Sequence, residues 1–171
     1  DALWVEVARR CSPCKILFFR GNDGHAARLE ARFRSAFVAA GVDFDAHVRF
    51  IPWLPQAQFF WLLQKADVML DTVGFSGFNT VMQAVECGTP VVAWDSRFAR
   101  GRFASGVLRA LNLDTWVADT HVSYADKVAQ LCADPKLREA VRHQLVERRK
   151  SLYEDRHSVA AFAALMEKLA A

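Results

Sequence analysis

The sequence has few cysteines, no long apolar run and little net charge, and each scarcity excludes a class of protein. Four cysteines in 171 residues do not make a disulfide scaffold. No apolar run reaches the roughly 18–20 residues of a membrane-spanning helix. A net charge of +3, with the basic residues scattered, gives no reason to expect a nucleic-acid-binding protein. The chain opens on Asp1 without a signal peptide, which favours a piece of a longer protein.

Two of the cysteines, Cys11 and Cys14, form a C-x-x-C motif whose surroundings argue against a redox or metal role. A redox C-x-x-C motif follows a strand and opens a helix, whereas this one follows a helical pattern and precedes the apolar segment 15–20. A zinc site would need a second ligand pair at suitable spacing, and the sequence contains none. We therefore expect ordinary reduced thiols at a helix end, and a cytosolic, cytoplasmic protein.

Short apolar segments alternate along the chain with segments of helical periodicity. Ile16–Phe19 is an apolar run typical of a strand buried on both faces. The predicted strands are 15–20, 48–52, 68–70, 90–94 and 115–118; the predicted helices are 2–10, 26–40, 55–65, 79–87, 103–111, one ending near 132, one starting at 134 and one carrying 159–169. This alternation favours an α/β fold, a parallel sheet of about five strands with helices on both faces, as one domain over residues 1–171.

Two of the predicted helix starts carry capping signals. Asp134 precedes Pro135, so aspartate caps the helix and proline takes the first helical position. Ser123, followed three residues later by Asp126, resembles a capping arrangement for the helix that ends near Cys132. Both helices follow the last predicted strand, so we expect the chain to end in helices.

The loop between the third strand and the next helix holds the strongest chemical signal. In an open parallel sheet, ligands bind beyond the carboxyl ends of the strands. Gly77 permits close approach of the backbone to a ligand, and Ser76, Asn79 and Thr80 place side-chain donors beside the free N–H groups of a helix start. The helix dipole makes such a place a ready anion site. The alternative interpretation is that Ser76 or Asn79 simply caps its own helix.

The loop after the fourth strand carries Arg97, Arg100 and Arg102. Arginines near an anion site can pair with a phosphate, although a solvated basic turn explains Arg97 and Arg100 equally well. The common glycine-rich nucleotide loops, G-x-x-x-x-G-K-S/T and G-x-G-x-x-G after the first strand, are absent from the sequence. The residues by themselves thus predict an α/β domain with a phosphate site after Thr72.

Three motifs in order and spacing carry a family resemblance: A-D-V-M-L-D-T at 66–72, G-F-N-T at 77–80 and C-G-T-P-V-V at 87–92. With them, the sequence from Trp4 onward resembles the carboxyl-terminal half of glycosyltransferases of the O-linked N-acetylglucosamine transferase type. Weaker similarity runs from Trp53 to the end of the chain. These enzymes have the GT-B architecture, two Rossmann-like halves with the nucleotide sugar bound mostly by the second. The resemblance implies that this chain is one Rossmann-like half.

The resemblance also implies a role for particular residues. Leu54 would offer its backbone to the uracil with Gln56 beside it, and Phe59 would stack on the ring. Asn79 and Thr80 would bind the diphosphate. Gln83, one turn later, would bind the ribose. The implied nucleotide-sugar site consists of Leu54, Gln56, Phe59, Gly77, Phe78, Asn79, Thr80 and Gln83, with Arg102 as a candidate phosphate contact. No metal or other cofactor is implied, because the sequence offers no paired-carboxylate cluster.

Five positions depart from the family pattern, and each change removes a charge or a donor. They are Gln56 for a lysine, Phe59 for a histidine, Leu62 for an arginine, Phe78 for a histidine and Gln83 for an aspartate. An amide can still hydrogen-bond a ribose hydroxyl, though less strongly than a carboxylate. The nucleotide therefore either differs from UDP or binds more weakly.

The resemblance predicts the donor-binding half of an enzyme that transfers a sugar from a UDP-sugar to a hydroxyl, in a protein acceptor. The resemblance implies that the family's acceptor contacts, proposed base and phosphate-binding lysine lie on segments upstream of Asp1, with helical repeats as a further candidate partner in the full-length protein. We therefore assign no catalytic residue and expect the isolated chain to be inactive. The expected partners are a nucleotide sugar and the upstream half, with no nucleic acid and no membrane. A sugar-nucleotide epimerase and a non-catalytic GT-B-like domain remain the alternatives.

Overall fold

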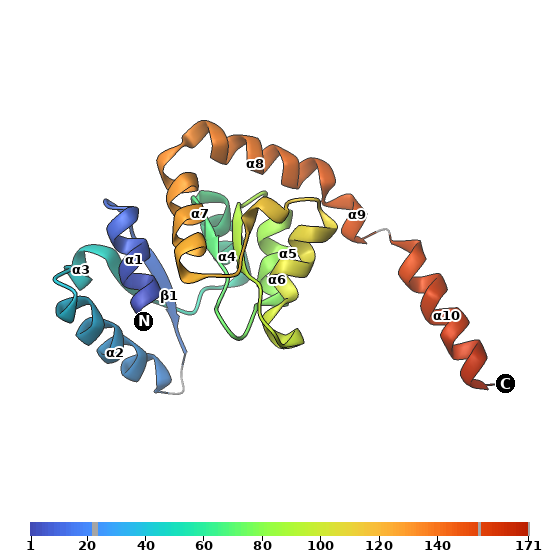
Figure 1. Ribbon diagram of the computed structural model, residues 1–171, viewed down its shortest axis with the longest axis horizontal. Coiled ribbons are helices and arrows are strands. Elements are labelled where there is room, and N and C mark those ends of the chain that lie inside the picture. Colours follow the sequence, from blue (N-terminus) through green and yellow to red (C-terminus); the bar gives the residue numbers. More distant parts are fainter. Residues whose placement is uncertain (22–23, 154, 171) are drawn as a thin grey trace.

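Strands and helices alternate along the chain as the sequence predicts. The computed structural model describes residues 1–21, 24–153 and 155–170 (Figure 1). The strands are β1 (Ile16–Arg20), β2 (Val48–Pro52), β3 (Met69–Leu70), β4 (Val91–Trp94) and β5 (Val117–Ala118). The helices are α1 (Ala2–Arg10), α2 (His25–Ala39), α3 (Phe44–His47), α4 (Gln56–Lys65), α5 (Phe78–Glu86), α6 (Phe103–Ala110), α7 (His121–Ala133), α8 (Pro135–Arg148), α9 (Lys150–Tyr153) and α10 (Arg156–Ala170), with short 3-10 helices η1 (Ala99–Gly101) and η2 (Asp114–Trp116).

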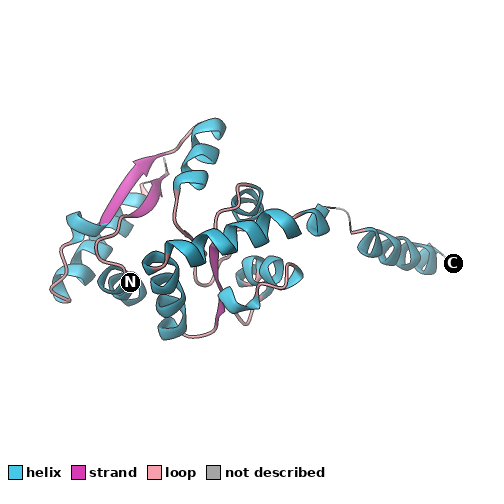
Figure 2. Ribbon diagram, turned by 90° about the horizontal axis from the view of Figure 1, so that it is seen from above, coloured by secondary structure: helices cyan, strands magenta, loops and turns pink. Residues whose placement is uncertain are grey.

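The five strands form two parallel sheets rather than one. Strands β1 and β2 pair from Ile16 opposite Val48 to Arg20 opposite Pro52, and a second sheet has the order β3-β4-β5. Figure 2 shows the two groups of strands apart from each other. Within the described residues, β1 pairs only with β2 and β3 pairs only with β4.

The split sheet corrects one expectation about β1. The run Ile16–Phe19 was expected to be buried on both faces, but Leu17 is 39% exposed while Ile16 is buried. A strand of a two-stranded sheet has one unpaired edge and fewer covering elements, so its apolar side chains cannot all be covered. The α/β class holds, while the continuity of the sheet does not.

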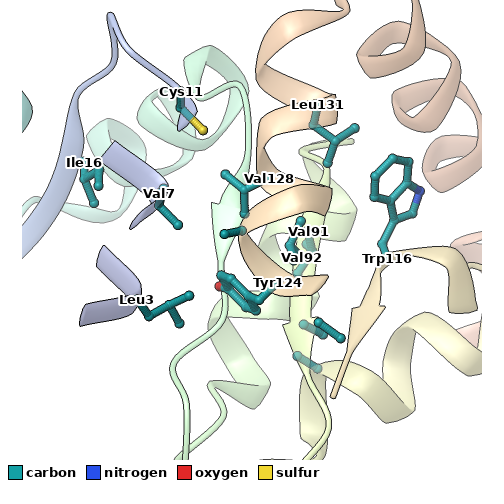
Figure 3. Packing of buried hydrophobic residues seen from close by; sticks show 14 of the residues in the cluster. Leu3, Val7, Cys11, Ile16, Val91, Val92, Trp116, Tyr124, Val128 and Leu131 are labelled. Carbon is teal, nitrogen blue, oxygen red and sulfur yellow. The ribbon is translucent and has the colours of Figure 1, made fainter. Parts of the chain in front are cut away.

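Helices α1 and α7 lie against each other and form the centre of the core. Figure 3 shows Leu3 and Val7 of α1 beside Tyr124 and Val128 of α7, with Val91 and Val92 of β4 behind them. The Trp4 ring of α1 packs edge-on against Phe18 of β1, at 5.6 Å between centroids, and against Tyr124, at 6.3 Å. Because Trp4 contacts both, α1 connects the small sheet to α7 and through it to the larger sheet.

The last helix projects away from the rest of the chain (Figure 1). The sequence predicts a helix with apolar residues at Val159, Phe162, Leu165, Met166 and Leu169, and the structure confirms the helix as α10. None of its residues is buried, and each of those apolar side chains is at least half exposed. Over the described ranges of the chain, no helix is both long and apolar enough to cross a membrane.

One of the two capping predictions is confirmed and the other is wrong. Asp134 accepts hydrogen bonds from the N–H groups of Lys136 (2.9 Å) and Leu137 (3.1 Å), with Pro135 at the start of α8. Helix α7 is instead capped by Thr120, whose Oγ1 accepts a hydrogen bond from the N–H of Ser123 at 3.1 Å. Because the helix begins at His121, Ser123 lies within its first turn and receives the cap.

The Asp134 cap predicts a measurable contribution to stability. Replacing Asp134 by alanine leaves two N–H groups of α8 without a partner and should lower the free energy of unfolding by about 1 kcal/mol. Asp134→Asn keeps an acceptor at the same position and should cost much less. Urea unfolding of the two variants and the parent measures the difference. An Asp134→Ala protein as stable as the parent would show that the cap contributes nothing.

Candidate functional site

The loops that follow β3 and β4 are joined into one surface. The N–H of Ser76 donates to the carbonyl of Arg100 at 2.8 Å, and the N–H of Ala104 donates to Ser76 Oγ at 2.8 Å. Gly101 is needed where the loops touch, because a Cβ there would lie 2.6 Å from the Cβ of Ser96 and 3.3 Å from the carbonyl oxygen of Gly74. The carboxyl ends of these two strands thus present one continuous set of side chains.

The buried side chain of Asp71 holds the first of these loops. Its carboxyl accepts hydrogen bonds from Ser76 Oγ (2.8 Å), the N–H of Gly77 (3.3 Å) and the N–H of Trp94 in β4 (3.3 Å). Its backbone carbonyl accepts a hydrogen bond from the hydroxyl of Tyr124 at 2.9 Å. Burial raises the pKa of the Asp71 carboxyl, and the hydrogen bonds that it accepts offset part of that rise.

Ser76 therefore has a different role from the one that the sequence suggests. It was expected either to present a donor to a ligand or to cap its own helix. Instead it is buried, donates to Asp71 and accepts from Ala104, which lies in the first turn of α6. Ser76 thus caps a helix from across the site, and its hydroxyl is not available to a ligand.

The start of α5 has the features of an anion site. Gly77 is the N-cap residue, and within the described residues no side chain caps this helix start. The N–H groups of the first turn have no partner within the helix by its geometry, and the helix dipole favours an anion there. Asn79 is exposed and Thr80 is half-buried. The self-capping alternative for Asn79 is therefore not realised.

The hydroxyl of Thr80 folds back over Gly77. A Cβ added to Gly77 would lie 2.3 Å from Thr80 Oγ1, so any side chain at position 77 would displace that hydroxyl. Gln83 is half-buried and lies one turn further along α5, on the face that Asn79 and Thr80 share. The structure thus brings together Gly77, Phe78, Asn79, Thr80 and Gln83 of the predicted site.

The residues predicted to bind a base lie at the start of α4, next to the carboxyl ends of β1 and β2. Phe59 is half-buried, and its ring lies 5.7 Å from the ring of Phe19 at the end of β1. Phe19 also packs on Trp53, at 5.6 Å, and both line a cavity of about 650 Å³. Leu54 is half-buried and Gln56 is exposed. Since α4 packs against α5, the two groups of predicted residues lie on neighbouring helices.

Arg102, the candidate phosphate contact, is engaged with a carboxylate. Its Nε donates to Asp95 Oδ1 at 3.1 Å, and Arg109 Nη2 donates to Asp95 Oδ2 at 2.8 Å. The guanidinium of Arg109 holds the pKa of Asp95 below its usual range. Arg97 and Arg100 lie over the ring of Phe98, at 5.7 Å and 4.9 Å from its centroid. A phosphate at Arg102 would therefore compete with Asp95.

Sequence reasoning missed two features of this surface. One is the role of Asp71, whose partners lie up to 53 residues away in sequence. The other is an aromatic surface, because Phe75, Phe78, Phe98 and Phe103 are all 41% to 67% exposed around the two joined loops. The rings of Phe78 and Phe103 pack edge-on at 5.7 Å. The sequence does show four phenylalanines in and beside two polar loops, and this pattern could have predicted the aromatic surface. In the described part of the chain, no group of three or more His, Cys, Asp or Glu side chains is placed to hold a metal ion.

A family model and a solved structure resemble this chain. The model of glycosyl transferase family 41 matches residues 2–161. Among solved structures, a mutant O-GlcNAc transferase of Thermobaculum terrenum matches with a TM-score of 0.79 and 23% sequence identity. The match covers 98% of this chain and 31% of that protein, so the two share a fold over about a third of the longer chain. No curated protein gives a significant match.

The hydrogen bonds of Ser76 predict the effect of removing its hydroxyl. Ser76→Ala leaves the N–H of Ala104 and one oxygen of Asp71 without that partner in a buried place, which should cost about 1–3 kcal/mol of unfolding free energy. Thr72→Ala, at an exposed position in the same loop, is the matched control and should change stability by less than about 0.5 kcal/mol. Chemical unfolding measures both, and equal effects of the two substitutions would contradict this role of Ser76.

Proposed function

Because the chain belongs to glycosyl transferase family 41, we propose that it forms the donor-binding part of an enzyme that transfers a sugar from a UDP-sugar to a hydroxyl group of a protein. The observation that carries this proposal is the start of α5, where no side chain caps the helix within the described residues and the Thr80 hydroxyl lies over Gly77. Such a terminus, at the carboxyl edge of a parallel sheet, suits the diphosphate of a nucleotide sugar.

In this proposal, the N–H groups of Asn79 and Thr80 and the hydroxyl of Thr80 bind the diphosphate. Negative charge grows on that diphosphate as the bond to the sugar breaks. Fixed N–H donors and the positive end of the helix dipole stabilise this charge without having to reorient. The site therefore contributes to the reaction through electrostatics and orientation. In this proposal the helix N-terminus stabilises the charge of the diphosphate, and no metal ion is required for that role.

The nucleoside is proposed to lie toward α4. The family likeness assigns the base to Leu54, Gln56 and Phe59, and the ribose to Gln83. The contact between Phe59 and Phe19 supports an apolar wall beside the cavity at Trp53. Because Gln56, Leu62, Phe78 and Gln83 lack charge, affinity in this site must come mainly from stacking and from backbone donors.

The chain alone is proposed to bind the donor without catalysing transfer. Two separate sheets and a match to only 31% of the transferase from Thermobaculum terrenum support the view that further segments complete the site. The acceptor contacts and the base are proposed to come from those segments. A protein that binds no nucleotide would instead fit the non-catalytic alternative, and one that inverts a sugar hydroxyl would fit the epimerase.

Thr80 provides the direct test of the diphosphate site. Losing a hydrogen bond to a charged group costs about 1.5–3 kcal/mol, so Thr80→Ala should weaken UDP binding by about ten-fold to a hundred-fold. Gly77→Ala should weaken it in the same direction, because the new Cβ would displace the Thr80 hydroxyl. Titration calorimetry on the full-length protein measures both affinities, and thermal unfolding checks the fold.

Stability separates this role from a purely structural one. Since no side chain caps α5 in the described chain, Thr80→Ala should leave the free energy of unfolding within about 0.5 kcal/mol of the parent. A loss of stability near 1 kcal/mol with unchanged UDP affinity would mean that Thr80 acts as a helix cap and not as a ligand contact.

Phe59 provides a second test, directed at the base. If its ring stacks on the base, Phe59→Ala should weaken UDP binding by about 1–3 kcal/mol, the scale of base–aromatic stacking. Trp61→Ala, at a 60% exposed aromatic position on the same helix, is the control and should leave the affinity unchanged. Fluorescence or calorimetric titration gives both values. Equal affinities of the Phe59→Ala protein and the parent would place Phe59 in the packing of α4 only.

A further inference from the structure

The two joined loops expose four phenylalanine rings and two arginine side chains. We call this set the phenylalanine surface, and its members are Phe75, Phe78, Phe98, Phe103, Arg97 and Arg100. Single exposed apolar side chains are normal on a protein, whereas several that gather in one place mark an interaction site. The members come from two loops and two helix starts, so only the fold brings them together.

The contacts between the loops hold the first part of this surface. Phe75 precedes Ser76, whose N–H donates to the carbonyl of Arg100 at 2.8 Å. The guanidinium of Arg100 lies over the ring of Phe98, at 4.9 Å from its centroid, and that of Arg97 lies at 5.7 Å. Phe75 and Phe98 therefore belong to one surface although they come from different loops.

The other two rings lie at the starts of helices. Phe78 is the first residue of α5 and Phe103 the first residue of α6, and their rings pack edge-on at 5.7 Å. The buried hydroxyl of Ser76 accepts the N–H of Ala104, the residue after Phe103. Because hydrogen bonds behind the rings already fix the backbone that carries them, a partner that covers the surface has little of it left to order.

The surface carries positive charge that the described part of the chain does not neutralise. Arg97 and Arg100 are exposed, and among the described residues neither forms an ion pair or a side-chain hydrogen bond. Arg102 differs, because its Nε donates to Asp95 at 3.1 Å. A carboxylate on a partner can form a charge-assisted hydrogen bond with either unpaired guanidinium, so the surface suits a partner that is both apolar and acidic.

Aromatic rings beside arginines also occur where single-stranded nucleic acid binds, but the geometry here favours a peptide. Base stacking needs open ring faces, whereas guanidinium groups lie over Phe98, and Phe78 is packed edge-on against Phe103. A nucleic-acid strand also needs a row of cations along its phosphates. Two unpaired arginines suit the few carboxylates of a protein segment better.

We propose that the phenylalanine surface binds an acidic segment of the protein acceptor, whose apolar side chains cover the rings while its carboxylates pair with Arg97 and Arg100. This inference rests on the proposed function, because it takes the sugar to be held at the start of α5, where Phe78 lies. A segment bound here brings a serine or threonine hydroxyl to the edge of the donor site. The surface thus selects acidic, partly apolar segments as substrates.

The test is peptide binding to the full-length protein, followed by fluorescence anisotropy. The probe is a labelled peptide in which glutamate and leucine residues surround a single serine, and a matched peptide has lysine in place of glutamate. We expect the glutamate peptide to bind at least about ten-fold more tightly than the lysine peptide. A single-stranded oligouridylate of similar length is the nucleic-acid probe and should bind more weakly than the glutamate peptide.

Phe98 tests the apolar part of the surface. Phe98→Ala should weaken binding of the glutamate peptide by about ten-fold or more, the effect of removing an aromatic anchor from an interface. The matched control is Phe162→Ala, at an exposed phenylalanine of α10, the helix that projects away from the rest of the chain (Figure 1). That control should leave the affinity unchanged.

Charge reversal distinguishes recognition from a structural effect of the same residues. The double variant Arg97→Glu, Arg100→Glu should bind the lysine peptide more tightly than the glutamate peptide, a reversal that damage to the fold cannot produce. The double variant Arg156→Glu, Lys168→Glu makes the same change of charge on α10 and should keep the preference for glutamate.

Titration of the same proteins with UDP separates a failure of this inference from a failure of the proposed function. Phe98→Ala should keep the UDP affinity of the parent. UDP binding with no peptide binding, with equal affinities for the two peptides, or with tighter binding of the oligouridylate would overturn the acceptor surface alone. Peptide binding without UDP binding would overturn the proposed function, and with it the assignment of the peptide as an acceptor.

A covered surface would also give a distinct result. If another part of the full-length protein lies over the rings, the parent would bind neither peptide and Phe98→Ala would lower its Tm, while Phe162→Ala would not. That outcome would overturn the proposal in favour of an internal contact.

Discussion

The buried carboxyl of Asp71, at the end of β3, is the interaction on which the candidate site depends. It fixes Ser76 and Gly77 in the loop that leads to α5 and reaches across to the N–H of Trp94 in β4. Through Ser76 the same network caps α6, and through its carbonyl it meets Tyr124 of α7. Burying a carboxyl is costly, and these hydrogen bonds offset the cost while they hold the loop in a single conformation.

That fixed loop explains the geometry at the start of α5. The N–H of Gly77 donates to Asp71, and the Thr80 hydroxyl lies on the side of Gly77 where a Cβ would otherwise be. The start of α5 is thus set by contacts from the preceding loop and by the hydroxyl of its own Thr80. Buried hydrogen bonds that hold a loop keep its N–H donors in fixed positions, which is what electrostatic stabilisation of an anion requires.

The sequence predicted much of the fold because its signals are local. Apolar runs such as Val91–Trp94, and the pairing of Asp134 with Pro135, act within a few residues and are confirmed. One local signal was misread: Ser123 was expected to cap its helix, but the helix begins at His121 and Thr120 caps it. The separation of β1 from β3 and the roles of Asp71 and Ser76 depend on contacts between distant segments, which periodicity cannot reveal. The site motif was located correctly on a strand–helix turn, while the ligand roles of its residues stay predictions.

The central claim is that α5 binds the diphosphate of a nucleotide through its N-terminus. Titration calorimetry of the full-length protein with UDP and with UMP tests it most directly, because the two ligands share base and ribose and differ in the second phosphate. We predict that UDP binds at least about ten-fold more tightly than UMP, the effect of one or more hydrogen bonds to a charged group. Equal affinities for UDP and UMP, or no binding of either, would contradict it.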